Sequence, residues 1–189
     1  MKEYSIFFAK SDYYNIIKNV GGEWNDSKER PLVCLLKIDD SDIYWAIPIG
    51  NWYHRDEAGQ QRIMSFINSN PHGIQSCFYH IGKTTTRSIF FISDAVPITD
   101  KYFDRSYLGY NNQPYIIRNT KLQNALIIKL KRILRQEKLH PNYFRQHITD
   151  IKNYLINELK QENNNAAYKM PDSKAAFSES KLNNNAELI

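Results

Sequence analysis

The spacing of apolar and polar positions along the chain changes near residue 112. The first part contains short apolar runs bounded by polar residues, which is the pattern of β-strands. We expect strands at residues 4–8, 31–38, 43–49, 77–81, 88–93 and 96–98. Two other segments, 11–20 and 56–68, repeat apolar residues at helical spacing, and Ser11 stands where an N-cap belongs. Residues 1–112 therefore predict mostly sheet with two short helices, and the second and third strands are close enough in sequence to form a hairpin.

After residue 112, apolar residues recur every three or four positions, as on one face of a helix. One helix is expected over 116–135, and a second from Pro141, a favoured first helical residue, to Lys160. The sequence thus predicts an α+β protein in which a C-terminal helical hairpin packs on a small sheet. We divide the chain into a domain of residues 1–161, with the helical hairpin at 113–161, and a polar tail of residues 162–189 that buries little.

Positive charge is concentrated in the helical part. The chain carries a net charge of +5, and residues 101–161 hold twelve Lys/Arg against four Asp/Glu, whereas residues 1–100 hold ten against twelve. Localised positive charge suits a polyanion, although a solvated basic helix without a partner is about as common. The candidates for contacts to nucleic-acid phosphates on this helix are Lys121, Lys129, Arg132 and Arg135. Thirteen tyrosines and nine phenylalanines add candidates for base stacking, although most aromatic side chains belong to the core.

Other classes of function are disfavoured. The chain has no apolar run near the ~18 residues of a membrane span, and its start is strand-like, so we expect a cytoplasmic protein with no membrane partner. Cys34 and Cys77 lie in apolar segments and are expected to be reduced and buried. The five histidines are scattered without ligand spacing, so no metal site and no cofactor are expected.

The stretch FYHIGKTTTRSIFFISD (78–94) contains Gly82-Lys83-Thr84, which is how a nucleotide-binding P-loop ends. The first glycine of such a loop would stand five residues earlier, where the chain has Cys77, and a strand follows in place of a helix. The stretch therefore predicts a hairpin loop, but one rich in donors that suit a phosphodiester. Those donors are His80, Lys83, Thr84, Thr85, Thr86, Arg87 and Ser88.

Three stretches resemble the endoribonuclease toxins of type III toxin-antitoxin systems, the ToxN/AbiQ/CptN family, and most closely its CptN-like branch. They are YWAIPIGNWYHR (44–55), HIGKTTTRSIFFISDAVPIT (80–99) and KYF (101–103) with the basic helix that follows. The resemblance implies a twisted antiparallel sheet with an SH3-like barrel core, related to the MazF/PemK toxins. It also implies a bacterial phage-defence toxin that cleaves cellular RNA without a metal and leaves a 2′,3′-cyclic phosphate. Its partner would be a small antitoxin RNA made from a repeat, bound in a hetero-oligomeric protein–RNA assembly.

The chain departs from the family after the rim proline. Where ToxN-like members carry a Thr/Ser-rich stretch with a lysine, this sequence has Gly50-Asn51-Trp52-Tyr53-His54-Arg55. The catalytic lysine and hydroxyl of the family therefore have no counterpart there, and Lys83 with its neighbouring threonines would have to take those roles.

Cleavage by the 2′-hydroxyl needs a base, an acid and donors that hold the charge of the phosphorane. His80 is the first candidate for proton transfer, or else a structural histidine at a strand end; Lys83 is the candidate for phosphate charge, or else a solvated loop lysine. Thr84, Thr85 and Ser88 would position oxygens, or else face the strands. Candidates for RNA contacts at the sheet rim are Arg87 and a second cluster, Tyr53, His54 and Arg55.

Two other functions stay open on the sequence. A noncatalytic RNA-binding module would use the same basic helix and aromatic surface, and a helical protein-interaction adaptor would have lost its active site. The sequence does not decide whether the segments 50–55 and 80–88 form one site.

Overall fold

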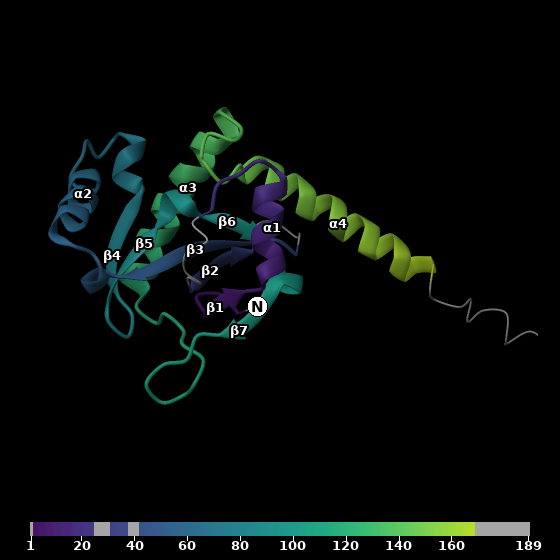
Figure 1. Ribbon diagram of the computed structural model, residues 1–189, viewed down its shortest axis with the longest axis horizontal. Helices are drawn as coiled ribbons and strands as arrows, with labels where there is room; N and C mark the ends of the chain where they lie inside the picture. The colour runs from purple at the N-terminus through teal and green to yellow at the C-terminus, as the bar shows by residue number, and fades with distance from the viewer. Residues whose placement is uncertain (1, 25–30, 38–41, 169–189) are drawn as a thin grey trace, which may run out of the picture. The chain divides into compact units, whose positions relative to one another are not determined.

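The computed structural model describes residues 2–24, 31–37 and 42–168 (Figure 1). Residues 1–155 form one compact unit, and residues 156–189 form another, of which the part up to Tyr168 is described. The strands are β1 (Ile6–Ala9), β2 (Leu32–Lys37), β3 (Tyr44–Asn51), β4 (Tyr79–Lys83), β5 (Arg87–Phe91), β6 (Val96–Ile98) and β7 (Phe103–Ser106). The α-helices are α1 (Ser11–Asn19), α2 (Glu57–Ile67), α3 (Thr120–Leu139) and α4 (Ile148–Tyr168). Short 3₁₀ helices are η1 (Trp52–His54), η2 (Ile74–Cys77), η3 (Ile92–Asp94) and η4 (Asp100–Tyr102). Within the described residues no helix is both long and apolar enough to cross a bilayer.

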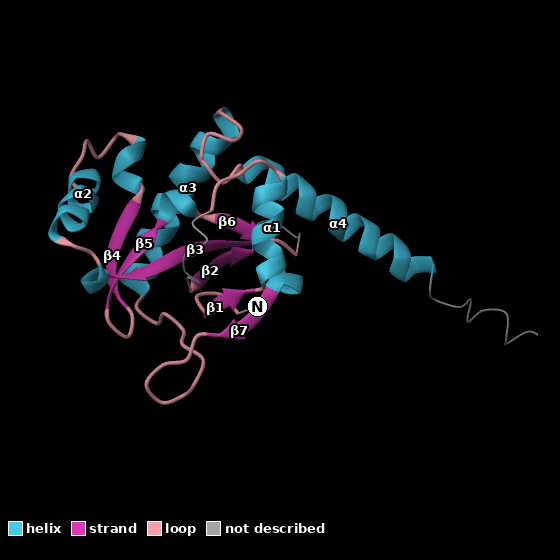
Figure 2. Ribbon diagram, viewed as in Figure 1, coloured by secondary structure: helices cyan, strands magenta, loops and turns pink. Residues whose placement is uncertain are grey.

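The described strands form one antiparallel sheet of seven strands in the order β4-β5-β3-β2-β1-β7, with β6 also paired to β3 (Figure 2). β3 pairs with three other strands, β2, β5 and β6. Its first part pairs with β2 and with β6, and its last three residues pair with β5. A long shared strand therefore carries the β4–β5 hairpin at the end where it reaches Asn51.

Most of the expected strands and the hairpin of β2 and β3 are confirmed, and β6 has the predicted bounds. The acidic turn that would join β2 and β3 lies outside the described residues, apart from Asp42. β7 was missed because its sequence, FDRS, has no apolar alternation; its backbone pairs with β1. Cys77 is buried and free as expected, but it ends a 3₁₀ helix and does not begin a strand. The side chain of Cys34 lies outside the described part of the chain.

Helices α3 and α2 pack on opposite faces of the β4–β5 hairpin. Side chains alternate between the two faces of a strand, so neighbouring residues of β5 enter different clusters. Phe90 joins the main core with Leu122 and Leu126 of α3, whereas Ile89 and Phe91 join a smaller core with Ile63 of α2. Both faces of the hairpin are therefore covered by helices: β5 is buried beyond Arg87, β4 is partly buried, and Lys83 and Arg87 at the end are exposed.

The start of α4 differs from the prediction. Pro141 does not begin the helix, which starts at Ile148, and the segment between carries two residues with positive φ, Asn142 (58°) and His147 (57°). The buried carboxylate of Glu137 holds this turn, because it accepts the backbone N–H of Asn142 (2.7 Å) and the N–H and hydroxyl of Thr149. Side-chain hydrogen bonds thus replace the helical ones that the apolar spacing had suggested.

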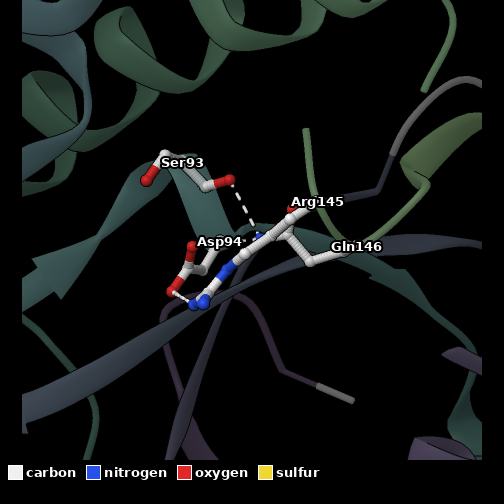
Figure 3. Close-up of polar contacts among 4 residues, drawn as sticks. All are labelled: Ser93, Asp94, Arg145 and Gln146. Carbon is white, nitrogen blue, oxygen red and sulfur yellow. Dashed lines mark hydrogen bonds and ion pairs between the residues drawn. The ribbon is translucent and has the colours of Figure 1, made fainter. Parts of the chain in front are cut away.

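The same turn is tied to η3. Arg145 donates to Asp94 (2.7 Å), and Gln146, which is fully buried, donates to the Ser93 carbonyl (2.9 Å) and to Asp94 (3.2 Å; Figure 3). At its other end α4 continues to Tyr168, through the residue-161 boundary that the sequence had suggested. The rest of the expected tail, residues 169–189, lies outside the described residues.

Candidate functional site

The two clusters singled out in the sequence lie side by side at the end of the hairpin. Asn51, the last residue of β3, is the register partner of Ser88 on β5. Just beyond this pair, the guanidinium of Arg87 lies over the ring of Trp52, 4.7 Å from its centroid. We call residues 51–55 together with residues 83–88 the rim. The pairing of β3 with β5 therefore places the segments 50–55 and 80–88 next to each other.

Hydroxyl groups close the loop of the hairpin. Lys83 and Arg87 are its last paired residues, and the Thr84 N–H donates to the Thr86 carbonyl (2.9 Å). The hydroxyls of Thr84 and Ser88 are 2.7 Å apart, and Ser88, which is buried, also donates to the Thr86 carbonyl (3.2 Å). Ser88 and Thr84 were predicted as catalytic hydroxyls, but their hydrogen bonds hold the loop in shape. In the structure the two hydroxyls bond to each other, and Ser88 also bonds to the loop backbone.

The glycine of Gly82-Lys83-Thr84 has a packing role. A Cβ at Gly82 would lie 2.7 Å from Cδ1 of Leu122 in α3, closer than real Cβ atoms come to their neighbours. The absence of a side chain lets the N-terminal turn of α3 rest on the hairpin. In the motif that resembled the end of a P-loop, Gly82 therefore leaves room for the packing of α3.

His80 and Lys83 do not converge, contrary to the expectation that both would serve one phosphate. They are three residues apart on β4, so their side chains leave the strand on opposite faces. His80 is paired with Phe90 and shares the α3 face, where burial, followed by the charge of Lys129, lowers the pKa of its imidazole. Lys83 is exposed at the end of the hairpin. The half-buried His80 therefore favours its neutral form and lies away from the loop.

The imidazole that does lie at the rim is that of His54. Asn51 caps η1 by accepting the Tyr53 N–H (2.9 Å), and this cap brings the Asn51 amide nitrogen to 3.5 Å from Nε2 of His54. His54 is exposed, and Tyr53 is 69% exposed. Arg55 lies over the Phe91 ring, 5.4 Å from its centroid. The rim thus presents an imidazole, an amide and exposed cations on one short stretch of surface.

The basic residues of α3 separate into two groups. Lys129 donates to the carbonyls of Ser76 (2.8 Å) and Tyr79 (2.7 Å), and burial is the main cause that lowers the pKa of its amine. Arg132 donates to three carbonyls of the loop before η2, at Pro71, His72 and Gly73. Both had been expected to contact RNA phosphates, but their donors hold the segment that leads into β4.

The remaining α3 cations are exposed. Lys121 and Arg135, both expected at an RNA surface, face solvent, and so does Lys131, which the sequence reasoning passed over. The signal for this division was present, because Lys129 lies three residues after the buried Leu126 and four before the buried Ile133. That spacing places Lys129 beside the apolar stripe of the helix.

Two tyrosines that the sequence did not single out contact the hairpin loop. The hydroxyl of Tyr107 is 3.2 Å from that of Thr85, and the hydroxyl of Tyr110 donates to the Thr85 carbonyl (3.0 Å). Thr85, the third predicted catalytic hydroxyl, is therefore also a structural partner. Both tyrosines lie in an irregular loop between β7 and α3, and no periodicity in that loop marks them.

The hairpin and α3 come from two stretches of sequence that contain no acidic residue, 58–93 and 105–136. The first supplies the hairpin and the second supplies α3, and the two stretches contact each other. Their basic residues are Arg62, Lys83, Arg87, Arg105, Arg118, Lys121, Lys129, Lys131, Arg132 and Arg135. Arg105 is paired with Asp104, and the other basic residues give these stretches an excess of positive charge, which attracts anions.

In the part of the chain that the structure describes, no three His, Cys, Asp or Glu side chains are grouped so that they could hold a metal ion. No protein-family model matches the chain, and no curated protein matches it. The function of the rim is therefore inferred from the geometry and chemistry of its own residues.

Proposed function

We propose that the protein is an endoribonuclease toxin that binds and cleaves RNA at the rim. The observation that carries the proposal is the pairing of Asn51 with Ser88, which brings the segment of His54 beside the cationic end of the hairpin. An imidazole that transfers protons near neutral pH and cations that hold phosphate charge are what cleavage by the 2′-hydroxyl requires.

In the proposed reaction the 2′-oxygen bonds to phosphorus as its proton leaves, and the bond from phosphorus to the 5′-oxygen breaks. The 5′-oxygen takes up a proton, and the products are a 2′,3′-cyclic phosphate and a 5′-hydroxyl. His54 is the group for proton transfer. Arg87 and Lys83 stabilise the charge that develops on the phosphate oxygens, and the stacking of Arg87 on Trp52 holds its guanidinium in place before substrate arrives.

The assignment to the type III toxins rests on the resemblance of residues 44–55 and 80–99 to the ToxN/AbiQ/CptN family. An antiparallel sheet in which one long strand is shared between two groups of strands supports the proposed relation to SH3-like barrels and to MazF/PemK. On this proposal a small antitoxin RNA occupies the rim and the exposed face of α3. Its phosphates would lie against the surface formed by the two stretches without acidic residues.

Single-turnover cleavage of RNA in the presence of EDTA tests the proposal. Replacing His54 with alanine should slow cleavage by about two to four orders of magnitude, and Arg87→Ala by about two to three. His140→Ala, which removes an exposed imidazole at the turn after α3, is the matched control and should cleave like the wild type. Thermal melting of each variant checks that it is folded.

Two outcomes would contradict the assignment of roles. If His80→Ala abolishes cleavage while His54→Ala does not, the reaction occurs between β4 and α3 and not at the rim. If the wild type binds RNA but does not cleave it, the protein is a noncatalytic RNA-binding module. The use of the Thr84 and Ser88 hydroxyls inside the loop favours that second function, because it leaves fewer free donors for chemistry.

A further inference from the structure

The ring of Tyr110 is held in position although almost nothing covers it. The residue is 87% exposed, yet its hydroxyl donates to the carbonyl of Thr85 at the end of the hairpin. The loop that carries it is closed by hydrogen bonds from the Gly109 N–H to Gln113 and from the Asn112 N–H to Gly109. An exposed side chain usually samples several rotamers, whereas this one has a fixed hydroxyl end and a closed loop behind it.

A second exposed tyrosine, Tyr53, belongs to a segment that also adjoins the hairpin. Tyr53 is 69% exposed on η1, and its backbone N–H is fixed by the Asn51 cap. The hairpin end that Tyr110 contacts is joined to Asn51 through the pairing of β5 with β3. Lys83 and Arg87, both exposed, lie at that same hairpin end. Two exposed tyrosines and two exposed cations therefore belong to the end of the hairpin and to the segments that adjoin it.

We infer that Tyr110 forms a binding site for one unpaired nucleobase, which stacks on its ring while the neighbouring phosphate lies at Lys83 and Arg87. Every base has a flat π-face, and stacking on an aromatic side chain gives affinity with little dependence on sequence. A base inside a duplex has no free face, so this site selects single-stranded RNA. The surrounding positive charge fits a phosphate chain. The inference rests on the proposed function for the identity of the nucleic acid.

The hydroxyl anchor gives the site a property that a loose surface tyrosine lacks. Because the ring is already ordered, binding a base does not have to immobilise it, and less conformational entropy is lost. Removing only the hydroxyl should therefore weaken stacking, and removing the ring should weaken it further.

A binding experiment on the full chain tests the site without any cleavage. The probe is a single-stranded 2′-O-methyl oligonucleotide, which lacks the attacking hydroxyl, with 2-aminopurine placed at each position in turn. At one position the fluorescence should be quenched by stacking, and Tyr110→Ala should remove that quenching and weaken binding by about 5- to 150-fold. Tyr110→Phe should give a smaller loss. Tyr143→Ala, which removes another exposed tyrosine at the turn after α3, should bind like the wild type.

An abasic nucleotide at the quenched position sharpens the test. The wild type should bind this probe more weakly, whereas Tyr110→Ala should lose nothing more, because the stacking partner is already missing. A 2′-O-methyl duplex of the same sequence should bind equally to the wild type and to Tyr110→Ala. Tyr110→Leu, which keeps an apolar side chain without a π-face, replaces the alanine variant if that variant melts early.

The inference is wrong if Tyr110→Ala binds the single strand as the wild type does, or if it loses affinity for single strand and duplex alike. Its failure is distinct from that of the proposed function. A wild type that stacks the probe through Tyr110 but never cuts ordinary RNA would refute cleavage and leave the base site standing. If the wild type and Tyr110→Ala cut RNA at the same rate and bind the probe alike, the base site is refuted and cleavage stands.

Discussion

Helix α3 carries two pairs of cations that look alike in the sequence and differ in the structure. Lys129 and Arg132 point back onto the protein and donate to five backbone carbonyls between Pro71 and Tyr79. Lys131 and Arg135 lie on the same two turns but face solvent. The first pair fixes the position of β4, and the second pair is available to a partner.

The difference shows that positive charge on a helix has two uses that composition cannot separate. A half-buried cation that donates to several backbone carbonyls satisfies acceptors that would otherwise lack partners, so its removal should lower the stability of the fold. An exposed cation contributes little to folding and acts through long-range attraction, so its removal should affect binding. Three sets of variants test this difference between inward-facing and exposed cations, and they are given in order of the expected size of their effects.

The largest effect is expected from Lys129→Met. Methionine keeps an unbranched apolar stem and a similar helix propensity but leaves the Ser76 and Tyr79 carbonyls without their charged donor. The free energy of unfolding should fall by about 2 kcal/mol, in the range for hydrogen bonds to a charged group. Urea unfolding followed by circular dichroism measures it. Lys131→Met is the matched control and should change stability by less than about 0.5 kcal/mol. Equal losses in the two variants would erase the distinction.

The second effect is on RNA binding. Replacing Lys131 and Arg135 together with glutamine should flatten the dependence of log K on log salt by roughly 0.7 to 0.9 for each phosphate that the protein no longer neutralises. Fluorescence anisotropy with a labelled RNA between low and moderate salt gives the slope. Lys129→Met, measured where it is fully folded, should keep the wild-type slope. If instead Lys129→Met flattens the slope and the double variant does not, the inward-facing lysine is the one that binds RNA.

The smallest effect concerns His80, which lies on the side of β4 that faces α3, within the electrostatic influence of Lys129. Burial, and then the charge of Lys129, lower the pKa of His80, so over an interval below its ordinary value of about 6.5 the unfolded chain binds a proton that the folded chain does not. Stability should therefore be retained above pH ~6.5 and decline as the pH falls through the lowered pKa of the folded state.

His80→Gln should remove that part of the pH dependence, and Lys129→Met should reduce it, as measured by urea unfolding at several pH values. His140→Gln, at an exposed position, serves as the control and should leave the profile unchanged. A wild-type profile that His80→Gln does not alter would mean that other groups set the acid sensitivity.

The elements that sequence reasoning found are those whose own residues determine them. The strand at Val96–Ile98 and the helix beginning after Asp56 carry local apolar patterns, and Asp56 caps its helix by accepting the Gly59 N–H (2.8 Å). The start of α4 could not be found in this way. The apolar spacing of Phe144 and Ile148 is helical, but the buried Glu137 from another helix takes the hydrogen bonds and holds a turn there.

The candidate site was found in part for a similar reason. Lys83, Arg87 and His54 could be picked out because donors clustered in short stretches. Other features depend on contacts across the hairpin and between loops. These are the hydrogen bond between the Thr84 and Ser88 hydroxyls and the bond from Tyr110 to the Thr85 carbonyl. The opposite faces of His80 and Lys83, however, followed from strand alternation alone and were open to prediction from the sequence.

The contacts between the first helix and the turn before α4 bear on how the chain folds as it is synthesised. His147 bonds through Nδ1 to the Val20 carbonyl (3.0 Å), and the Glu23 N–H donates to the Arg145 carbonyl (2.7 Å). Each bond joins segments more than 120 residues apart, so the loop-closure entropy is large and the N-terminal helix has no complete docking site until nearly the whole unit has left the ribosome. Sequence separation of this size is typical of slow folders. A nascent chain that stops short of residue 145 would lack the carbonyl to which the Glu23 N–H donates, so the segment after α1 would stay undocked until the turn before α4 has been synthesised.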